Sequence, residues 1–532
     1  MVLAFERDQV EYDIGCEDIL ARHGSVASAL LRVGQRDYRT VVLGPHTENI
    51  NAKTMDLLER FVQGGGGVLC CGDPPALIDG AQSDRGQGLA KAANWKRADA
   101  DAVPAILLRD AKDGFAVRRA DGDKGILFHH RRHLRDGQLL FLVNTSIESA
   151  SSGSVDSRLK GVEQWDLHTG NVAPYPFEAT SEGVRSAFEL PPSGSLLLFL
   201  SKEKRDPVPA VSEKTTKVEP AGAPEIRCIE PNVLVLDYVD VTAGGETKTN
   251  TYVYQASQFA FQKNGMDRNP WDSAVQFRDA LITKKFPADS GLEATYRFTI
   301  QDRVPATLFV VIERPDLYAI TCNGKAVSAA NGAWWLDKAF GKIDIAAAAR
   351  VGENEIVLKA SPFTIYHELE SAYVLGDFAL QAGDKGFTIA GKQKLRLGPW
   401  NEQGHPFYSA GVAYVQKFNL AAPSSEYRVS LPRWYGSVAK VVVNGKPAGL
   451  IGFPPWQCSI TDLVRAGTNT VEVVIIGTLK NTLGPHHGKP GLGTAWPAMF
   501  HKAPNPGPPP GKDYSTVGYG LREPFTLLHV TH

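Results

Sequence analysis

The sequence predicts a mainly β protein that carries an α/β domain at its N-terminus. Three observations support this. Gly 51 and Pro 34 are both high, as in chains built from many short strands and turns. Val441–Val443 runs into Asn444-Gly445, which is a strong signal for a β-hairpin. A looser copy of that unit, roughly 120 residues upstream around Asn323-Gly324, indicates a duplicated domain.

Residues 1–95 are expected to form the α/β domain. Tyr38 to Pro45 reads as a buried strand, and Ala52 to Gln63 has apolar residues on one helical face. Gly64 to Gly67 ends that helix, and Val68 to Gly72 is the next strand, so the order predicts a parallel βαβ unit. The glycine run ends a helix and has no Lys-Ser/Thr after it, which argues against a phosphate-binding loop.

The next segment, residues 96–203, is expected to be a small β-sandwich. Its clearest signal is the turn Arg135-Asp136-Gly137 between two strand-like runs. Residues 204–224 are rich in Lys, Glu and Pro without periodicity, which predicts a linker. The duplicated sandwiches then occupy residues 225–380 and 381–532.

The bulk composition excludes several classes of protein. Lys+Arg 57 against Asp+Glu 58 gives a net charge of -1, so we expect no nucleic-acid partner. No apolar run approaches the roughly 18 residues of a membrane span, so we expect no membrane partner. The start Met-Val-Leu-Ala-Phe-Glu-Arg-Asp is not typical of a secretory signal. The six cysteines form no C-x-x-C and are expected to be free thiols.

Histidines occur in two groups. His129, His130 and His133 lie on one strand with arginines between them, which favours a solvent- or domain-facing arm over a metal site. His486 and His487 follow a strand on a loop, where side chains are well placed to meet a ligand. A hydrogen bond that fixes this loop inside a domain interface is the alternative.

Carboxylates are candidates for acid–base chemistry. Glycoside hydrolysis uses two carboxyl groups roughly 5 to 10 Å apart. We take Glu313, Glu368 and Glu370 as candidate catalytic residues, with Glu368 and Glu370 expected on one face of a strand about 7 Å apart. The alternatives are pairing with arginine, or a calcium ion held by Asp337 and Asp377; no cofactor is expected to be required.

Tryptophans at turns and strand ends are candidates for sugar binding. An indole offers an apolar platform to the C–H face of a sugar ring, while nearby polar groups fix its hydroxyls. The predicted sugar-binding residues are Trp271, Trp335, Trp400 and Trp456, together with His486 and His487. Packing in a core or a domain interface is the alternative for each indole.

Several of these motifs resemble a known family. Val441 to Lys446 with Gly467-Thr468-Asn469 resembles the galactose-binding-like jelly roll of family-two-type glycoside hydrolases. Asn232 to Tyr238, Asn269 to Asp272 and Leu479 to His487 are similar to the C-terminal region of multidomain bacterial α-L-rhamnosidase-like hydrolases of the family 106 type. Residues 21–25 and 38–43 resemble the start of a flavodoxin-like, amidotransferase-like domain in those enzymes.

The resemblance implies a carbohydrate-binding accessory portion of a glycoside hydrolase. In such relatives a preceding (β/α)₈ barrel of about 250 residues supplies the acid and base, and this sequence has no room for one. No catalytic residue is therefore carried over, and a barrel in cis or in trans is an implied partner. Two alternatives stay open: an active glycosidase with its site between the sandwiches, and a structural module that works in trans. The relatives are usually exported, and Cys70-Cys71 lacks the nucleophile context of an amidotransferase.

Overall fold

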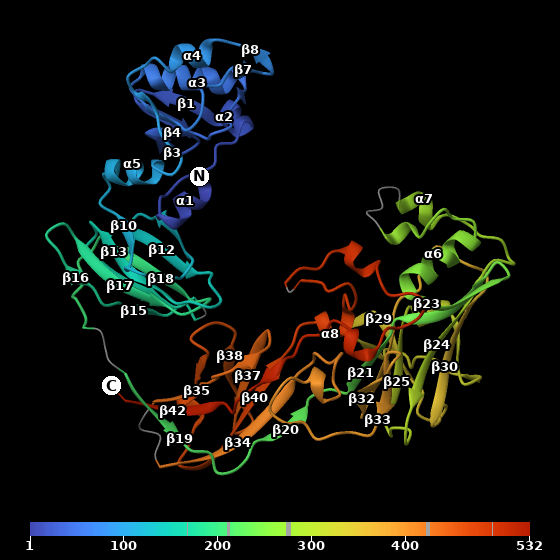
Figure 1. Cartoon of the computed structure of the whole chain (residues 1–532). Coiled ribbons are helices and arrows are strands. Elements are labelled where there is room, and N and C mark those ends of the chain that lie inside the picture. The colour runs from blue at the N-terminus through green and yellow to red at the C-terminus, as the bar shows by residue number, and fades with distance from the viewer. Residues whose placement is uncertain (168, 210–212, 273–277, 422–425, 492, 532) are drawn as a thin grey trace. The chain divides into compact units, whose positions relative to one another are not determined.

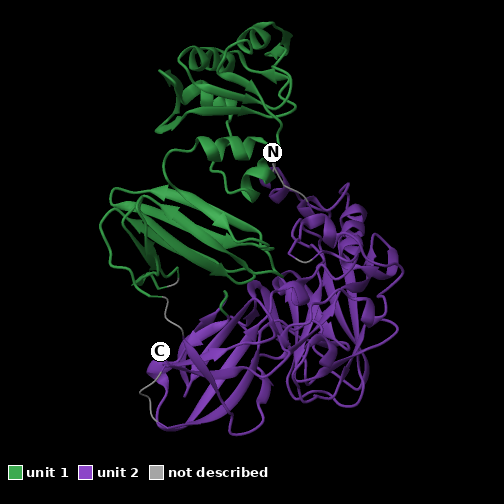
Figure 2. Ribbon diagram, turned by 60° about the vertical axis from the view of Figure 1, so that its left-hand side comes forward, with its two compact units in different colours: residues 1–212, 453–455 green, residues 213–452, 456–532 purple. Residues whose placement is uncertain are grey.

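The computed structural model describes the chain except residues 168, 210–212, 273–277, 422–425, 492 and 532. The fold is mainly β, as predicted, with a helical N-terminal region (Figure 1). It divides into two compact units, and Figure 2 shows them in different colours. Unit 1 is Met1–Ser212 with Phe453–Pro455, and unit 2 is Glu213–Gly452 with Trp456–His532. Among the described helices, none is both long and apolar enough to cross a membrane.

The N-terminal part of unit 1 contains the predicted βαβ unit. β4 (Thr40–Leu43) and β6 (Gly67–Cys70) pair in parallel, and α3 (Ala52–Gln63) connects them. Position 66, just after this helix, requires glycine because a Cβ there would lie 2.1 Å from the Phe61 ring. The other elements are α1 (Val2–Arg7), α2 (Glu17–His23), β1 (Gly24–Ala27), β2 (Leu30–Val33), β3 (Arg36–Tyr38), β5 (Asn49–Ile50), β7 (Leu77–Ile78), β8 (Ala81–Gln82), α4 (Arg85–Leu89), β9 (Trp95–Arg97) and α5 (Val103–Asp110).

The rest of unit 1 is a sandwich of two antiparallel sheets, ordered β10-β13-β17-β16 and β11-β12-β18-β14-β15. The predicted hairpin is present, with Leu127 opposite Asn144 and His133 opposite Gln138. In β17, buried and exposed residues alternate strictly, as expected for a strand with one face on a core. The strands are β10 (Ala116–Arg119), β11 (Leu127–His133), β12 (Gly137–Asn144), β13 (Ser151–Ser157), β14 (Gly161–Trp165), β15 (Val172–Pro174), β16 (Glu178–Ala179), β17 (Val184–Leu190) and β18 (Ser195–Ser201).

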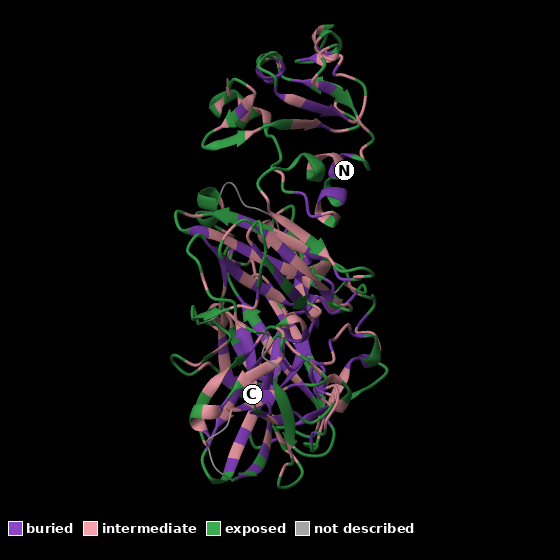
Figure 3. Ribbon diagram, turned by 90° about the vertical axis from the view of Figure 1, so that its left-hand side faces the viewer, coloured by how far each residue is buried: buried purple, intermediate pink, exposed green. Residues whose placement is uncertain are grey.

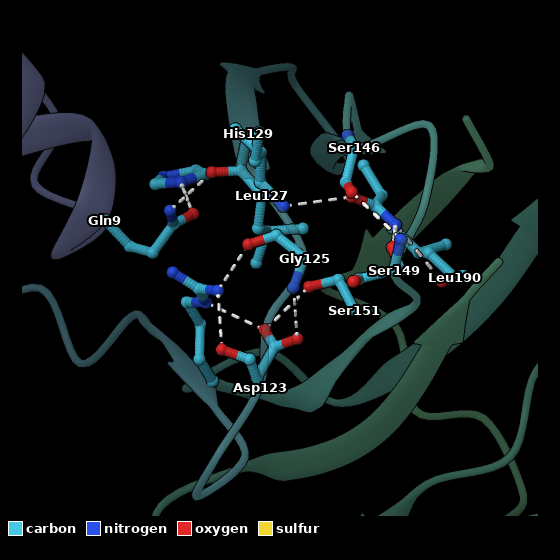
Figure 4. Close-up of polar contacts among 12 residues, drawn as sticks. Gln9, Asp123, Gly125, Leu127, His129, Ser146, Ser149, Ser151 and Leu190 are labelled. Atoms are coloured by element: carbon cyan, nitrogen blue, oxygen red, sulfur yellow. Dashed lines mark hydrogen bonds and ion pairs between the residues drawn. The ribbon is translucent and has the colours of Figure 1, made fainter. Parts of the chain in front are cut away.

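Gln9, just after α1, joins these two parts of unit 1. Its Nε2 donates to the carbonyl of Leu127 at 2.8 Å, and its Oε1 lies 2.9 Å from Nδ1 of His129 (Figure 4). His129 therefore contacts the N-terminal segment. Arg131 also pairs with Glu11 of that segment, and in addition with Asp113. The strand carrying these histidines faces a neighbouring part of the chain, which was one of the two predicted alternatives.

Unit 2 begins with the first of the duplicated sandwiches. One sheet has the order β21-β31-β25-β29-β28, and the other contains β23-β22-β24-β30-β26-β27 with β32 and β33. Helix α6 (Val253–Lys263) buries Phe259 and Phe261 in the core. The remaining elements are β21 (Asn232–Leu236), β22 (Tyr238–Ala243), β23 (Glu246–Tyr252), α7 (Arg278–Ile282), β24 (Leu292–Ile300), β25 (Leu308–Glu313), β26 (Ala319–Cys322), β27 (Lys325–Ala326), β28 (Trp334–Trp335), β29 (Asp337–Asp344), β30 (Gly352–Ala360), β31 (Ala372–Gly376), β32 (Ala379–Ala382) and β33 (Phe387–Ala390).

The second sandwich packs the sheet β20-β34-β40-β37-β38 and the sheet β19-β42-β35-β39 around its own core. Figure 3 shows how buried and exposed residues are distributed along the chain. Its elements are β19 (Lys214–Val218), β20 (Glu225–Cys228), β34 (Val412–Leu420), β35 (Glu426–Ser430), β36 (Trp434–Tyr435), β37 (Val438–Val443), β38 (Lys446–Ile451), β39 (Gln457–Ser459), β40 (Gly467–Ile476), α8 (Lys480–Leu483), β41 (Gly520–Leu521) and β42 (Thr526–Thr531).

Two expectations about the middle of the chain need correction. The predicted linker contains β19, an exposed strand that pairs with β42. Its sequence, Lys-Thr-Thr-Lys-Val, looks like a linker because edge strands tolerate lysine and need no buried face. In addition, β20 pairs with β34 of the second sandwich, whereas β33 pairs with β24 of the first. The segments near 225 and 381 therefore cross between the two sandwiches.

The predicted hairpin and its upstream copy have the same backbone geometry. Asn444 and Gly445 have φ of 52° and 80°, and Asn323 and Gly324 have φ of 49° and 78°. Both central residues of a type I′ turn need positive φ, which Asn and Gly tolerate best. This shared turn supports a duplicated origin for the two sandwiches.

Candidate functional site

Three predicted carboxylates come together in a recess of the first sandwich. Glu313 is the last residue of β25, and Glu368 and Glu370 lie in the irregular segment before β31. β25 and β31 pair antiparallel, with Val311 opposite Tyr373, so the end of one strand meets the start of the other. We call this the acidic recess. Its lining residues are Tyr296, Ile312, Glu313, Tyr318, Leu358, Glu368, Leu369, Glu370 and Ser371.

The expected strand position of Glu368 and Glu370 is wrong, because β31 starts only at Ala372. Side chains fix this irregular segment instead. Tyr296 donates to the carbonyl of Glu370 at 2.6 Å, and Tyr318 donates to that of Glu368 at 3.2 Å. Oε1 of Glu368 accepts from Nδ2 of Asn269 at 2.5 Å.

The surroundings of the recess raise the pKa of its three carboxyl groups. Glu370 is reached by solvent, yet the surrounding protein displaces much of the water that would stabilise its charge. That crowding, together with Glu368 and Glu313, raises the pKa of Glu370 to about 8. Burial, followed by the charge of Glu368, also raises the pKa of Glu313. An accessible carboxyl that holds its proton near neutral pH is suited to general-acid chemistry.

A larger cavity of about 440 Å³ lies beside the recess, and Tyr318 lines both. We call it the Trp334 cavity, because the half-exposed indole of Trp334 lines it. Charged and polar side chains share the lining with the indole. They are Arg314, Asp316, Ser328, Asn331 and Lys338.

Trp335, the predicted sugar-binding residue, lines a different cavity of about 260 Å³. Residues of both duplicated sandwiches line it, and its rim includes Leu336, whose φ is 60°. Successive side chains of a strand point to opposite faces, so the tandem tryptophans of β28 serve two separate cavities. Trp334 was not among the predicted sugar-binding residues, although the sequence signal that selected Trp335, a tandem pair of tryptophans, includes it.

The other predicted indoles divide into two classes. Trp271 is partly exposed and stacks on Tyr366 at 6.4 Å, while its Nε1 donates to the carbonyl of Ile365. Trp456 is also partly exposed and packs edge-to-face on Trp434 at 5.2 Å. Trp400, by contrast, is only 1% exposed. It cannot form a sugar platform, because the core of the second sandwich surrounds it and Tyr414 accepts from its Nε1.

The ligand-facing prediction for His486 and His487 is also corrected, since both are buried. Nε2 of His486 hydrogen-bonds to the carbonyl of Asn481, and Nε2 of His487 lies 2.8 Å from Oδ2 of Asp237. Tyr514 donates to the other oxygen of Asp237 at 3.0 Å. Sequence reasoning missed Asp237, although a lone acid directly after the buried run Asn232–Leu236 signals a buried polar partner.

Asp337 and Asp377 lie in different surroundings. Asp337 lies close enough to Glu313 to raise the pKa of that carboxyl, whereas Asp377 pairs with Lys392 at 2.7 Å. In the part of the chain that the structure describes, no group of three or more His, Cys, Asp or Glu side chains is arranged to hold a metal. Calcium binding at these positions stays a prediction.

No family model matches the chain, and no curated protein matches it. Among solved structures, a rhamnosidase from Novosphingobium sp. PP1Y is similar at 15% identity and a TM-score of 0.49, over 97% of this chain and 36% of that one. An α-L-rhamnosidase from Streptomyces avermitilis has 13% identity and a TM-score of 0.21, over 68% of this chain and 36% of that one. An exo-carrageenase from Bacteroides ovatus has 12% identity and a TM-score of 0.22, over 31% and 22%.

These three similar structures are glycoside hydrolases. The chain spans about a third of the length of the two rhamnosidases. All three have identities of 15% or less and TM-scores under 0.5.

Proposed function

We propose that this chain is the carbohydrate-binding, accessory portion of an α-L-rhamnosidase-like glycoside hydrolase that acts on plant or microbial glycans. The Trp334 cavity carries the proposal. Its volume of about 440 Å³ falls within the usual range for small-ligand sites. An indole beside charged and amide side chains also matches the apolar face and the hydroxyls of a sugar. The catalytic partner would be a (β/α)₈ barrel, in cis or in trans.

Sugar binding by the full chain tests this proposal. L-rhamnose, D-galactose and D-glucose are titrated while saturation transfer from protein to ligand is followed by NMR. We expect transfer to at least one sugar, lost in Trp334→Ala and kept in Trp496→Ala. Trp496 is a matched control because it is similarly exposed and lies outside the cavity. Equal transfer in wild type and Trp334→Ala would overturn the cavity assignment, and no transfer to any sugar would overturn carbohydrate binding.

A second candidate function is glycoside hydrolysis by the chain itself. The acidic recess favours it, because Glu370 holds its proton near neutral pH beside Glu313 and Glu368. In that mechanism Glu370 would protonate the leaving-group oxygen, and a neighbouring carboxylate would act as base or nucleophile.

Hydrolysis of p-nitrophenyl α-L-rhamnoside, β-D-galactoside and β-D-glucoside separates the two candidates. If the recess is catalytic, Glu370→Gln abolishes release of p-nitrophenol, whereas Glu353→Gln, an exposed change on β30, leaves it unchanged. Absence of turnover in the wild-type chain on all three would rule against hydrolysis. If sugar binding is absent as well, a structural module that works in trans with a barrel is the remaining hypothesis.

A further inference from the structure

We propose that the saccharide held in the Trp334 cavity carries a carboxylate, as uronic acids do. This inference rests on the proposed function and adds the charge of the ligand to it. Charged groups line the cavity, and hydrogen bonds already engage some of them.

Three charged side chains line the cavity: Arg314, Asp316 and Lys338. Arg314 and Asp316 satisfy each other, because Nε and Nη2 donate to Oδ1 and Oδ2 at 2.9 and 2.7 Å. This leaves Nη1 of Arg314 without a hydrogen bond to any described residue. Lys338 is exposed and likewise makes no hydrogen bond or ion pair within the described ranges. The lining therefore carries one unneutralised positive charge and a spare guanidinium donor.

Among the described residues, Asp316 is the one acid in the lining of the cavity. Glu313 lies opposite Phe340 across the β25–β29 pair, whereas Trp334 and Ile312 both lie opposite Gly341. Successive residues of a strand point to opposite faces, so Glu313 follows Ile312 on the other face of β25, although its charge still acts on the adjacent Arg314. Glu368 and Glu370 lie in the acidic recess, which meets the cavity at Tyr318.

This arrangement also orients the ligand. A carboxylate near Lys338 would be attracted, whereas the acidic recess beside Tyr318 offers it no positive charge. The sugar hydroxyls are then directed toward Tyr318, and the indole of Trp334 covers the ring face. We expect the carboxylate to improve affinity about tenfold at low salt, the size of a charge pair in a half-exposed site.

The test compares D-galacturonate with D-galactose, which share a ring and differ at C6. Isothermal titration of the full chain at 20 mM and 500 mM NaCl measures both affinities, with ~20 mM chosen because charge pairs are weakly screened there. We expect tighter binding of galacturonate at low salt, a smaller difference at high salt, and loss of that difference in Lys338→Met. Lys440→Met, an exposed strand lysine of the second sandwich, should behave as wild type.

The outcomes separate the two levels of the proposal. If galactose binds as tightly as galacturonate and Trp334→Ala abolishes both, the carboxylate inference is overturned while carbohydrate binding stands. A preference for galacturonate that survives in Lys338→Met, with folding confirmed by circular dichroism, also overturns the inference. If neither sugar binds the wild-type chain, the carboxylate inference is overturned, and the proposed function is then decided by the titrations with L-rhamnose and D-glucose.

Discussion

Nε2 of His487 lies 2.8 Å from Oδ2 of Asp237, although 250 positions separate the two residues. Asp237 sits between β21 and β22 of the first sandwich, and His487 follows α8 in the C-terminal part of the chain. Both side chains are almost fully buried, and the rings of Tyr238 and Tyr252 contact the imidazole edge-on. This pair therefore joins the two duplicated sandwiches inside unit 2.

We expect His487→Ala to destabilise unit 2 by about 3–5 kcal/mol, because it leaves a buried carboxylate short of a donor. Urea unfolding of wild type and variant measures the change. A double-mutant cycle with Asp237→Asn should show that the two effects are not additive. Additive effects would mean that the two side chains stabilise the fold independently, contrary to this prediction.

A second prediction concerns Asn469 of β40. It is fully buried, its Oδ1 accepts from the amide of Arg465 at 3.0 Å, and its Nδ2 donates to the carbonyls of Arg465 and Gly467. Asn469→Ala leaves these groups unpaired, so we expect a loss of about 2–4 kcal/mol in the free energy of unfolding. Asn331→Ala, an exposed loop change, is the control and should leave the unfolding midpoint in place.

The upstream copy predicts the same result for Asn354→Ala. Asn354 bonds Arg350 and Gly352 as Asn469 bonds Arg465 and Gly467, and Asn323 donates to it at 2.8 Å. Asn444 donates to Asn469 at 2.9 Å. Chemical denaturation of both variants checks the correspondence; a large loss at one site with none at the other would contradict it.

These examples show what the sequence can and cannot predict. Asn444-Gly445 identified a hairpin because turn geometry depends on adjacent residues. The partner of His487 could not be predicted, since nothing local specifies that Asp237 lies beside it. Trp400 looked like a loop indole for a similar reason: its burial depends on Tyr414, which reaches it across the fold. The three carboxylates of the acidic recess were predicted as a group, but the predicted position of Glu368 and Glu370 on a strand was wrong.

In unit 1, Glu11 makes stability depend on pH. Burial alone would raise its pKa, but the nearby imidazole of His129 and the hydrogen bonds from Arg131 lower it to about 2. Because the folded pKa lies below the unfolded value, the stabilisation is present above about pH 4.5 and is lost as the pH falls toward 2. The difference in thermal midpoint between wild type and Glu11→Gln should therefore shrink over this range. A constant difference from pH 6 to pH 2.5 would contradict the assignment.

Glu370 should produce the opposite dependence in unit 2. Crowding by the protein and the charges of Glu368 and Glu313 raise its pKa to about 8, above the value of the unfolded chain. The folded state therefore holds a proton that the unfolded state releases, so stability is highest below about pH 4.5 and declines as the pH rises to about 8. Glu370→Gln cannot ionise, and we expect it to be more stable than wild type at pH 8.5 and similar to it at pH 4. Thermal unfolding across this range measures the crossover, and ¹³C NMR of the glutamate carboxyl groups locates the titration directly. A Glu370 carboxyl that titrates at its ordinary pKa would show that the recess does not hold a proton at neutral pH, and would remove the basis for a general acid there.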